Sequence, residues 1–590
     1  MLLYKSAVNE ARSCYYSGII HSGSSNPRSL FSTINKLLKP HDNITSTFTT
    51  EKCDRLMSFF TSKIDTIHNQ LASSSANTPV PGPPLASPSI HRLSHFTPIT
   101  TADLSKIFST MKSSTSPLDP MSSDLIKACL TPLAPLITDT INSSLTTGTV
   151  PSPLKLAAIT PLLKKPGLDP DDPNNFRPIS NLTFLSKLLE GAVAAQLNQH
   201  LLTNKLYETF QSGFRTHHST ETALLKVTND LLLSSDSGTI TILLLLDLSA
   251  AFDTVNHSIL LNRLQSIGIT DTALLWFNSY LSGRSHYINI NNHTSSTTPV
   301  RHGVPQGSVL GPVLFILYIL PLGHIIRHHG LNFHCYADDT QLYINTKTIT
   351  PEILSTLTNC ITDIKIWMSQ NFLKLNSNKT EIIIFGPKSM LHTFQNFSLS
   401  IDGHSVTPSA LVRNLGLYMD PALSFKPHIN HITKTSFFHL RNLARLRPTL
   451  SPSAAETLIH AFITSRLDYC NSILYGLPSN VLQKLQYVQN SAARLLTRSP
   501  SREHITPILR KLHWLPIKQR IQFKILLITY KALNNLAPPY LTDLLHRHSP
   551  PCRLRSSDAN LLTPIIKTKY RTLGAEPSPS PPPPSGTPSP

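Results

Sequence analysis

The sequence predicts an α+β protein whose last third is helical and basic, and three observations support this fold class. An apolar run, ITILLLL at 240–246, predicts a buried strand that ends at an aspartate and leads into a helical pattern. The stretch FHCYADDTQLYI (333–344) alternates like a hairpin with two aspartates at its tip. After residue 421, apolar side chains recur at helical spacing, as in NVLQKLQYVQNSAARLL.

Changes in composition divide the 590 residues into six segments. Helical patterns open the chain, and SSSANTPVPGPPLASPS then interrupts them, because proline supports neither a helix interior nor a central strand. Mixed helix and strand patterns follow, and the chain ends in a proline-rich, low-complexity tail. We therefore expect a helical connector at 1–72, a Ser/Pro-rich linker at 73–96, a helical segment at 97–144, an α+β block at 145–420, a basic helical region at 421–575 and a disordered tail at 576–590.

Positive charge is concentrated in the C-terminal part of the chain. Lys and Arg total 52 against 33 Asp and Glu, a formal net charge of +19. Residues 421–590 hold 22 of the basic side chains and only 6 of the acidic ones, which leaves +3 for the first 420 residues. A basic region attached to a nearly neutral body indicates a surface for a polyanion such as nucleic acid. A generic basic face is the alternative interpretation.

Cysteine usage and the N-terminal residues favour a soluble intracellular protein. The seven cysteines show no CxxC spacing, which is typical of reduced thiols. The N-terminus, MLLYKSAVNEARS, lacks the apolar stretch of a signal peptide. The longest apolar runs, ITILLLLDL and VLFILYILPL, are shorter than the roughly 20 residues of a membrane-spanning helix. We therefore expect no membrane partner.

Three carboxylates form the most informative pattern in the sequence. Asp247 ends the most apolar strand, where an ionised side chain needs solvent, a partner or a metal. If the hairpin at 333–344 lies beside that strand, Asp338 and Asp339 come close to Asp247. Such oxygen ligands suit Mg²⁺, and two Mg²⁺ ions suit phosphoryl transfer. We interpret the two histidines of HINHI (428–432) as ordinary polar positions rather than zinc ligands.

Six motifs carry a resemblance to a known family. YADD (336–339), LDLSAAFD (246–253) and GVPQGSVLGP (303–312) resemble the catalytic core of a reverse transcriptase. NFRPIS, FQSGFRTHHST and NFLKLNSNKTE are similar to LINE-type (non-LTR) retrotransposon polymerases of the jockey-like and chicken-repeat kind. The resemblance implies a right-hand polymerase. Its fingers and its antiparallel-sheet palm would occupy 145–420 after a helical lead-in, and an α-helical basic thumb would follow.

The resemblance also assigns roles to the residues of the first two motifs. Asp247 and Asp338 would be the main ligands of two Mg²⁺ ions, and Asp339 would be the third catalytic carboxylate. The backbone carbonyl of Leu248 would bind one metal. Phe252 matches the bulky residue that stacks under the sugar and excludes a 2′-hydroxyl, although a plain core position is its alternative.

Further matching positions would bind the nucleotide. Gln306 and Gly307 would line the pocket around the nascent base pair, with glycine permitting close backbone approach, although turn chemistry alone also explains the glycine. Arg177 lies where the family's fingers reach the triphosphate, and guanidinium groups suit phosphate. Lys165 or Lys164 would assist there, and the sequence does not decide between them.

The remaining assignments concern proton transfer and nucleic acid. Lys379 would help to protonate the leaving pyrophosphate, and Arg215 would face substrate or template. A thumb made of basic helices would hold the duplex through its backbone phosphates, independently of sequence. The side chains that we expect to make these contacts are Lys434, Arg441, Arg445 and Arg447.

The resemblance implies an RNA template, a DNA primer or nicked target DNA, and dNTPs as partners, with work in the nucleus or the cytoplasm. A catalytically silent or co-opted nucleic-acid-binding relic of such an element is the alternative function. An RNA-templated RNA polymerase would share the metal chemistry, but Phe252 and the LINE-like motifs argue against it. Residues 1–90 hold no counterpart of the family's N-terminal endonuclease, so we expect a partial copy of an element.

Overall fold

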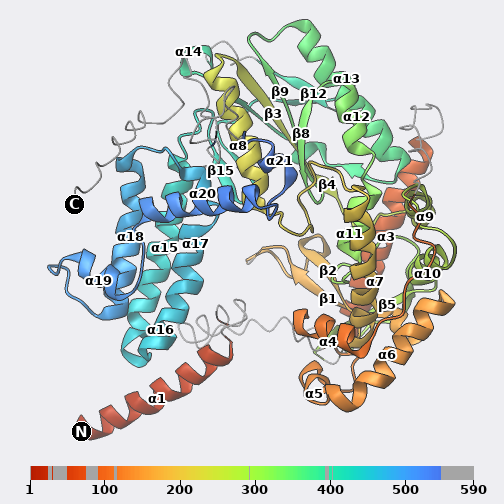
Figure 1. Ribbon diagram of the computed structural model, residues 1–590, viewed down its shortest axis with the longest axis horizontal. Coiled ribbons are helices and arrows are strands. Elements are labelled where there is room, and N and C mark those ends of the chain that lie inside the picture. The colour runs from red at the N-terminus through yellow and green to blue at the C-terminus, as the bar shows by residue number, and fades with distance from the viewer. Residues whose placement is uncertain are drawn as a thin grey trace, which may run out of the picture.

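The computed structural model combines helices and sheets around two large apolar cores (Figure 1). The α+β expectation is thereby confirmed. The expected tail at 576–590 and most of the expected linker at 73–96 lie outside the described residues. The structure describes residues 2–23, 30, 49–74, 91–111, 116–165, 167–291, 293–391, 397–401, 403–546 and 562.

The two N-terminal helices pack in different places. α1 (Leu2–Ser22) lies against α16 (Pro452–Ile459) in the C-terminal region. α3 (Thr50–Ser74) packs instead on β5 (Ser285–Ile290), on the opposite side of the molecule in Figure 1. The segment that we expected to be a single connector therefore contacts two distant parts of the fold.

A five-stranded sheet follows the lead-in helices α4 (Thr101–Thr110), α5 (Ser123–Ala128) and α6 (Leu130–Thr147). Its strand order is β2-β1-β5-β6, and β7 pairs with β5. β1 runs antiparallel to β2 and parallel to β5, so the loop at 164–175 is the hairpin tip between β1 and β2. The strands are β1 (Leu156–Leu163), β2 (Phe176–Asn181), β5, β6 (His293–Thr294) and β7 (Thr298–Pro299).

A four-stranded antiparallel sheet lies at the centre, in the order β11-β3-β9-β8. β3 is apolar except for Thr241, because both of its faces are covered. Leu243 joins the core formed with α8 and the C-terminal helices, whereas Leu244 joins the other core. The strands are β3 (Ile240–Leu246), β8 (Asn332–Tyr336), β9 (Asp339–Thr346) and β11 (Glu381–Phe385), and a short ladder of β4 (Leu248–Ser249) with β10 (Lys374–Leu375) extends from β3.

Helices surround both sheets, and one helical stretch among them is strongly apolar. We expected VLFILYILPL to be too short to span a bilayer, but the helical stretch Gly311–His328 is long and apolar enough by length and composition. Because 72% of it is buried inside the protein, it serves as part of the core. These helices are α7 (Phe184–Thr203), α8 (Thr220–Asp236), α9 (His257–Ser266), α10 (Asp271–Leu281), α11 (Gly311–Tyr318), α12 (Leu322–His328), α13 (Pro351–Gln370) and α14 (Lys388–Leu391).

The C-terminal region is helical, as the sequence predicts. Two small hairpins precede it, and a π-helical turn at His460–Thr464 interrupts it. The hairpins are β12 (Leu399–Ile401) with β13 (His404–Val406) and β14 (Val412–Asn414) with β15 (Leu417–Met419). The helices are α15 (Lys426–Leu446), α16, α17 (Ser465–Asp468), α18 (Ser479–Thr497), α19 (Ile505–Lys511), α20 (Ile517–Leu533) and α21 (Pro539–Thr542).

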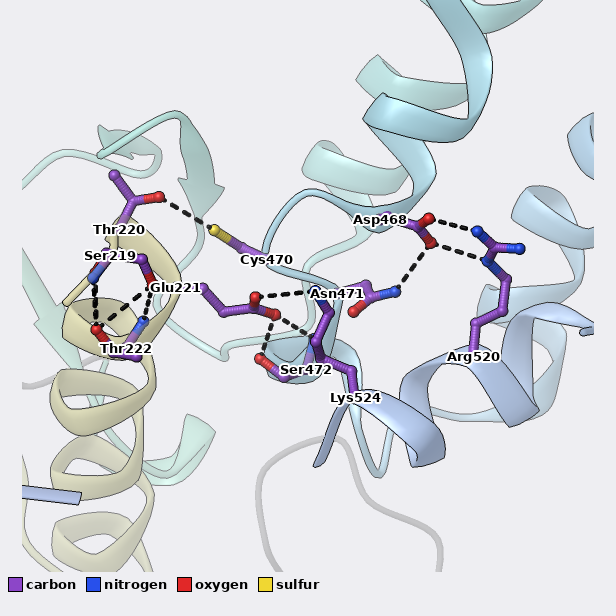
Figure 2. Close-up of polar contacts among 10 residues, drawn as sticks. All are labelled: Ser219, Thr220, Glu221, Thr222, Asp468, Cys470, Asn471, Ser472, Arg520 and Lys524. Atoms are coloured by element: carbon purple, nitrogen blue, oxygen red, sulfur yellow. Dashed lines mark hydrogen bonds and ion pairs between the residues drawn. The ribbon is translucent and has the colours of Figure 1, made fainter. Parts of the chain in front are cut away.

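Polar contacts at the start of α8 hold the C-terminal region against the central sheet (Figure 2). The Glu221 carboxylate accepts hydrogen bonds from Ser472, 3.2 Å from its backbone nitrogen and 2.7 Å from its hydroxyl. Lys524 of α20 lies 3.4 Å from the same carboxylate. Close by, the Arg520 guanidinium donates to both oxygens of Asp468. These contacts fix α20 relative to α8.

We predict that Glu221→Ala destabilises the protein by about 1–3 kcal/mol, because it leaves a mostly buried serine amide and a lysine without their charged acceptor. Urea unfolding monitored by circular dichroism measures the change. Glu456→Ala is the control, since that carboxylate is half exposed beside His460 and should change stability by less than about 0.5 kcal/mol. Equal effects of the two substitutions would contradict this account of the docking contact.

Candidate active site

The pairing of β3 with β9 brings the predicted carboxylates to one end of the central sheet. The register runs from Ile240 opposite Thr346 to Leu246 opposite Thr340. One further step along both strands places Asp247 across from Asp339. Asp338 lies in the turn that joins β8 to β9, directly beside Asp339.

The turn that carries Asp338 is clamped by the loop FQSGF (210–214). Gln211 accepts a hydrogen bond from the Ala337 backbone nitrogen over 2.8 Å and donates to its carbonyl oxygen over 3.1 Å. This double contact holds Ala337 in a left-handed conformation, with φ at 56°. The loop approaches so closely that a Cβ on Gly213 would lie 2.4 Å from the Ala337 nitrogen. The contacts of Gln211 were not predicted from the sequence.

The clamp is supported in turn by the C-terminal region. Ser212 Oγ lies 2.8 Å from His334 Nε2 and 2.7 Å from the hydroxyl of Tyr540, which belongs to α21. Tyr540 is buried, and its hydroxyl also donates to Thr222 over 3.1 Å. Burial lowers the pKa of His334 to about 3, so this histidine stays neutral within the network. A residue far along the chain thereby fixes the loop that holds the Asp338 turn.

The proton affinity of Asp338 and of Asp339 is raised at the site. Burial raises the pKa of Asp338, and the nearby Asp247 raises it further, while Arg177 and Lys379 oppose the shift. Burial by the surrounding protein and the two neighbouring carboxylates raise the pKa of Asp339 to about 6, although its side chain reaches solvent. Negative charge gathered in this way favours the arrival of cations.

Basic side chains surround the carboxylates. Lys379 Nζ lies 2.9 Å from Asp247 Oδ2, so the predicted proton donor forms an ion pair with a predicted metal ligand. Lys164 donates to the Asn174 carbonyl over 2.6 Å at the tip of the β1–β2 hairpin. Burial and the positive charges of Lys63, Lys379 and Arg177 lower the pKa of Lys164. Lys164 and Lys165 are both exposed on this loop, and the hydrogen bond to Asn174 belongs to Lys164.

Phe252 is partly buried in a cluster of aromatic rings beside the site. Its ring stacks on Phe315 with centroids 4.5 Å apart, and Phe214 meets it edge-on at 6.2 Å. The backbone of Phe252 is also fixed, because its carbonyl accepts a hydrogen bond from Val304 over 2.9 Å. The ring is thus supported on one side by the core.

Gln306 and Gly307 lie against β2. The Gln306 side chain donates to both oxygens of Asp253 at 2.8 Å. The backbone carbonyl of Gln306 accepts a hydrogen bond from the Ser180 backbone nitrogen at 2.8 Å. Gly307 has φ at 121°, and a Cβ there would lie 2.5 Å from the Ser180 carbonyl oxygen. Close approach of this backbone to β2 therefore requires glycine at position 307. Asp253, whose role was not predicted from the sequence, is partly buried, and burial raises its pKa to about 6.

Two basic residues have structural contacts instead of the predicted ones. Arg447 is buried, and its guanidinium donates to the carbonyls of Leu450, Leu495 and Leu496, so its assignment to nucleic acid is wrong. Arg215 donates to two carbonyls within its own loop and stacks on Tyr207. By contrast, the predicted side chains that are exposed along one face of α15 are Lys434, Arg441 and Arg445.

The donor set fits Mg²⁺, although no group of three His, Cys, Asp or Glu side chains in the described parts of the chain is arranged as a ready metal cage. Lys379 forms an ion pair with one oxygen of Asp247. Mg²⁺ usually takes one or two protein carboxylates and completes its shell with water and substrate phosphates. An open set of acidic oxygens is consistent with that requirement.

Comparison with known proteins gives this geometry a context. Residues 163–419 match the family model described as reverse transcriptase (RNA-dependent DNA polymerase). The chain is 26% identical over 381 residues to the probable RNA-directed DNA polymerase from transposon BS of Drosophila melanogaster, across 63% of this chain and 41% of that protein. The fly mobile element jockey polymerase is 27% identical, across 61% of this chain and 39% of that protein.

The probable polymerase of the Drosophila melanogaster X-element is also 27% identical, across 58% of this chain and 38% of its own length. The chain therefore spans about two fifths of the length of these relatives. A solved RNA-dependent RNA polymerase from a human picorbirnavirus aligns with 79% of this chain and 84% of its own at 13% identity and a TM-score of 0.36. At that score the likeness does not define the fold.

Residues 163–419 are a reverse transcriptase domain, in agreement with the carboxylates and the motifs around them. The relatives named above are RNA-directed DNA polymerases of Drosophila mobile elements, to which the chain is similar at 26–27% identity.

We predict that Gly213→Ala loosens the turn that carries Asp338. The added methyl would lie 2.4 Å from the Ala337 nitrogen, so one of the two backbones must move at a cost of about 1–3 kcal/mol. Hydrogen exchange at the Ala337 amide, followed by mass spectrometry, should become faster. Gly18→Ala in α1 is the control, because nothing lies within 4 Å of its Cβ position. Unchanged hydrogen exchange at the Ala337 amide in Gly213→Ala would contradict the role of the loop at 210–214 in holding this turn.

Proposed function

We propose that the chain is an RNA-directed DNA polymerase that extends a DNA 3′ end on an RNA template with dNTPs. The observation that carries this proposal is the β3–β9 register, which brings Asp247 beside Asp338 and Asp339 within a domain of the reverse transcriptase family. The activity is given as a proposal, because the chain covers only 41% of the length of the transposon BS polymerase.

The fold suggests how a right-hand polymerase would be divided. The four-stranded sheet with its flanking helices would be the palm, and the five-stranded sheet with the β1–β2 hairpin would form the fingers, both within 145–420. The helical region after residue 421 would be the thumb. The second core would join the thumb helices to one face of the palm sheet.

Asp247, Asp338 and Asp339 would hold two Mg²⁺ ions, with the Leu248 carbonyl as an additional ligand. Bound Mg²⁺ would neutralise phosphate charge and favour attack by the primer 3′-hydroxyl. The protein's own contribution is positioning, because the clamped turn keeps the acidic pair at the end of β3. Lys379, already at the site, would donate a proton to the departing pyrophosphate.

The nucleotide would lie between the palm and the β1–β2 hairpin. Arg177 and the lysines at the hairpin tip, Lys164 and Lys165, would bind its triphosphate. Phe252 would stack under the sugar, and its support by Phe315 would make it a rigid barrier to a 2′-hydroxyl. Gln306 and Gly307 would line the base-pair pocket.

The exposed basic face of α15 would follow the backbone of the RNA–DNA duplex. Lys434, Arg441 and Arg445 lie on one side of this helix, together with the half-exposed ring of Phe438. Such contacts would be sequence-independent and sensitive to salt. Extension of nicked target DNA would take place in the nucleus.

We expect Asp338→Asn to reduce primer extension on an RNA template by at least about 100-fold, because the substitution removes a charged metal ligand. Extension is measured with dNTPs and Mg²⁺, and duplex binding is measured by fluorescence anisotropy, which should be nearly unchanged. Asp124→Asn, at an exposed position of α5, is the matched control. Duplex binding without extension by either the native chain or the control would instead favour a binding relic.

We expect Phe252→Val to admit ribonucleotides, because the smaller side chain no longer fills the space below the sugar. The ratio of dNTP to rNTP incorporation should fall about 10-fold or more. Single-nucleotide extension with paired dNTP and rNTP substrates gives this ratio. Phe523→Val, at an exposed ring of α20, should leave it unchanged. An unaltered ratio in the Phe252 variant would leave Phe252 as a core residue only.

A further inference from the structure

Helix α3 lies outside the matched reverse transcriptase segment but is built into the same site. One side of the helix is apolar and packs on the five-stranded sheet, so it cannot leave without exposing a core. The buried residues of that contact are Cys53, Leu56, Met57 and Phe60 on the helix and Ile159, Phe176 and Ile288 on the sheet.

Polar contacts hold the first turn of α3 against the loop at 164–175 between β1 and β2, which we call the fingertip. Lys52 Nζ lies 2.5 Å from Asp171 Oδ1, in the loop between β1 and β2. Asp54 accepts hydrogen bonds from the backbone and hydroxyl of Ser296 at 2.8 and 2.9 Å. The N-terminal half of the helix is therefore tied to the loop that carries Lys164.

The last turns of α3 are fixed to the loops of the palm. His68 Nε2 lies 2.9 Å from the Thr254 carbonyl, and its ring stacks on His302 at 3.7 Å and on Phe372 at 4.6 Å. Lys374 Nζ donates to Gln70 Oε1 over 3.0 Å. Since both ends are held, the middle of the helix has a fixed position between fingertip and palm.

That middle segment forms one wall of a surface hollow. The hollow has a volume of about 410 Å³, within the range of ligand sites. Lys63 lines it together with Asn174, whose carbonyl holds Lys164, and with Ser249, two residues beyond Asp247. The hollow is therefore bounded by α3, by the loop between β1 and β2, and by the short strand β4 that follows Asp247.

The charge of Lys63 is available to a ligand. Within the described ranges no carboxylate lies within ion-pairing distance of its ammonium group, which lies 5.8 Å from the Phe59 ring centre. Its charge acts on Lys164 and on the partly buried Asp253. Lys63, Arg177 and Lys379 all act on Lys164, so these four cations lie near one another. Cations gathered at one spot attract a compact, highly charged anion.

We propose that Lys63 binds phosphate oxygens of the incoming nucleotide's triphosphate, and that α3 forms one wall of the triphosphate site. The inference rests on the proposed polymerase function and extends its nucleotide site to a helix outside the family segment. A triphosphate fits better than a duplex backbone, because these cations converge beside Asp247, whereas a backbone requires contacts spread along a surface.

The test compares Lys63→Gln, Lys63→Arg and the control Lys106→Gln in the full chain. Lys106 is exposed on α4 and pairs only with Asp103 of its own helix among the described contacts. Tripolyphosphate with Mg²⁺ is titrated by calorimetry, and dNTP KM and kcat are measured by primer extension. Loss of one charge-assisted contact should weaken tripolyphosphate binding and raise KM by about 3- to 10-fold, with kcat less affected.

The expected pattern is a weakened Gln variant, an Arg variant within about twofold of the native chain, and an unchanged Lys106 control. Duplex affinity, measured by anisotropy, should not change. A fall in duplex affinity with unchanged tripolyphosphate binding would overturn the proposal in favour of a backbone contact, and no change in either would leave Lys63 without a ligand role. Because the titration needs no turnover, it decides the role of Lys63 even if the native chain extends no primer.

Discussion

The hydrogen-bonded clamp between Gln211 and Ala337 is the contact on which the rest of the site depends. A tight turn must hold two adjacent carboxylates near a third, although their mutual repulsion and partial burial oppose this arrangement. A side-chain amide that satisfies both backbone groups of Ala337 keeps the turn in one conformation. The acidic pair can then stay aligned with the end of β3 without a bound cation.

The clamp depends on parts of the chain that are distant in sequence. Tyr540 reaches Ser212 from the C-terminal region, and Glu221 fixes α20 to the helix that follows the clamp loop. On the other side, α3 covers the five-stranded sheet and reaches the fingertip. The position of the carboxylates thus depends on contacts across the whole described fold. We therefore expect a substitution in the C-terminal helical region to affect the position of the carboxylates.

Local patterns in the sequence were sufficient for the strands and for the position of the acidic residues. The apolar run before Asp247 and the alternation around Asp338 each predict their own strand, and pairing the two brings the aspartates together. Helical periodicity also predicted α15, but it could not separate exposed from buried arginines. Arg447 satisfies carbonyl groups at the end of another helix, a contact that no local pattern encodes. Tyr540 was missed for the same reason, because Ser212 and Thr222 are far from it along the chain.

The burial of both faces of β3 has a consequence for how such domains can be exchanged. A segment cut to the family match at 163–419 would keep Asp247, Asp338 and Asp339 but lose side chains that cover Leu243 and Ile288. Each newly exposed apolar face would then favour self-association in water. Recombination between related elements would therefore succeed at boundaries outside α3 and α21, so that inherited modules are larger than the recognisable motif block.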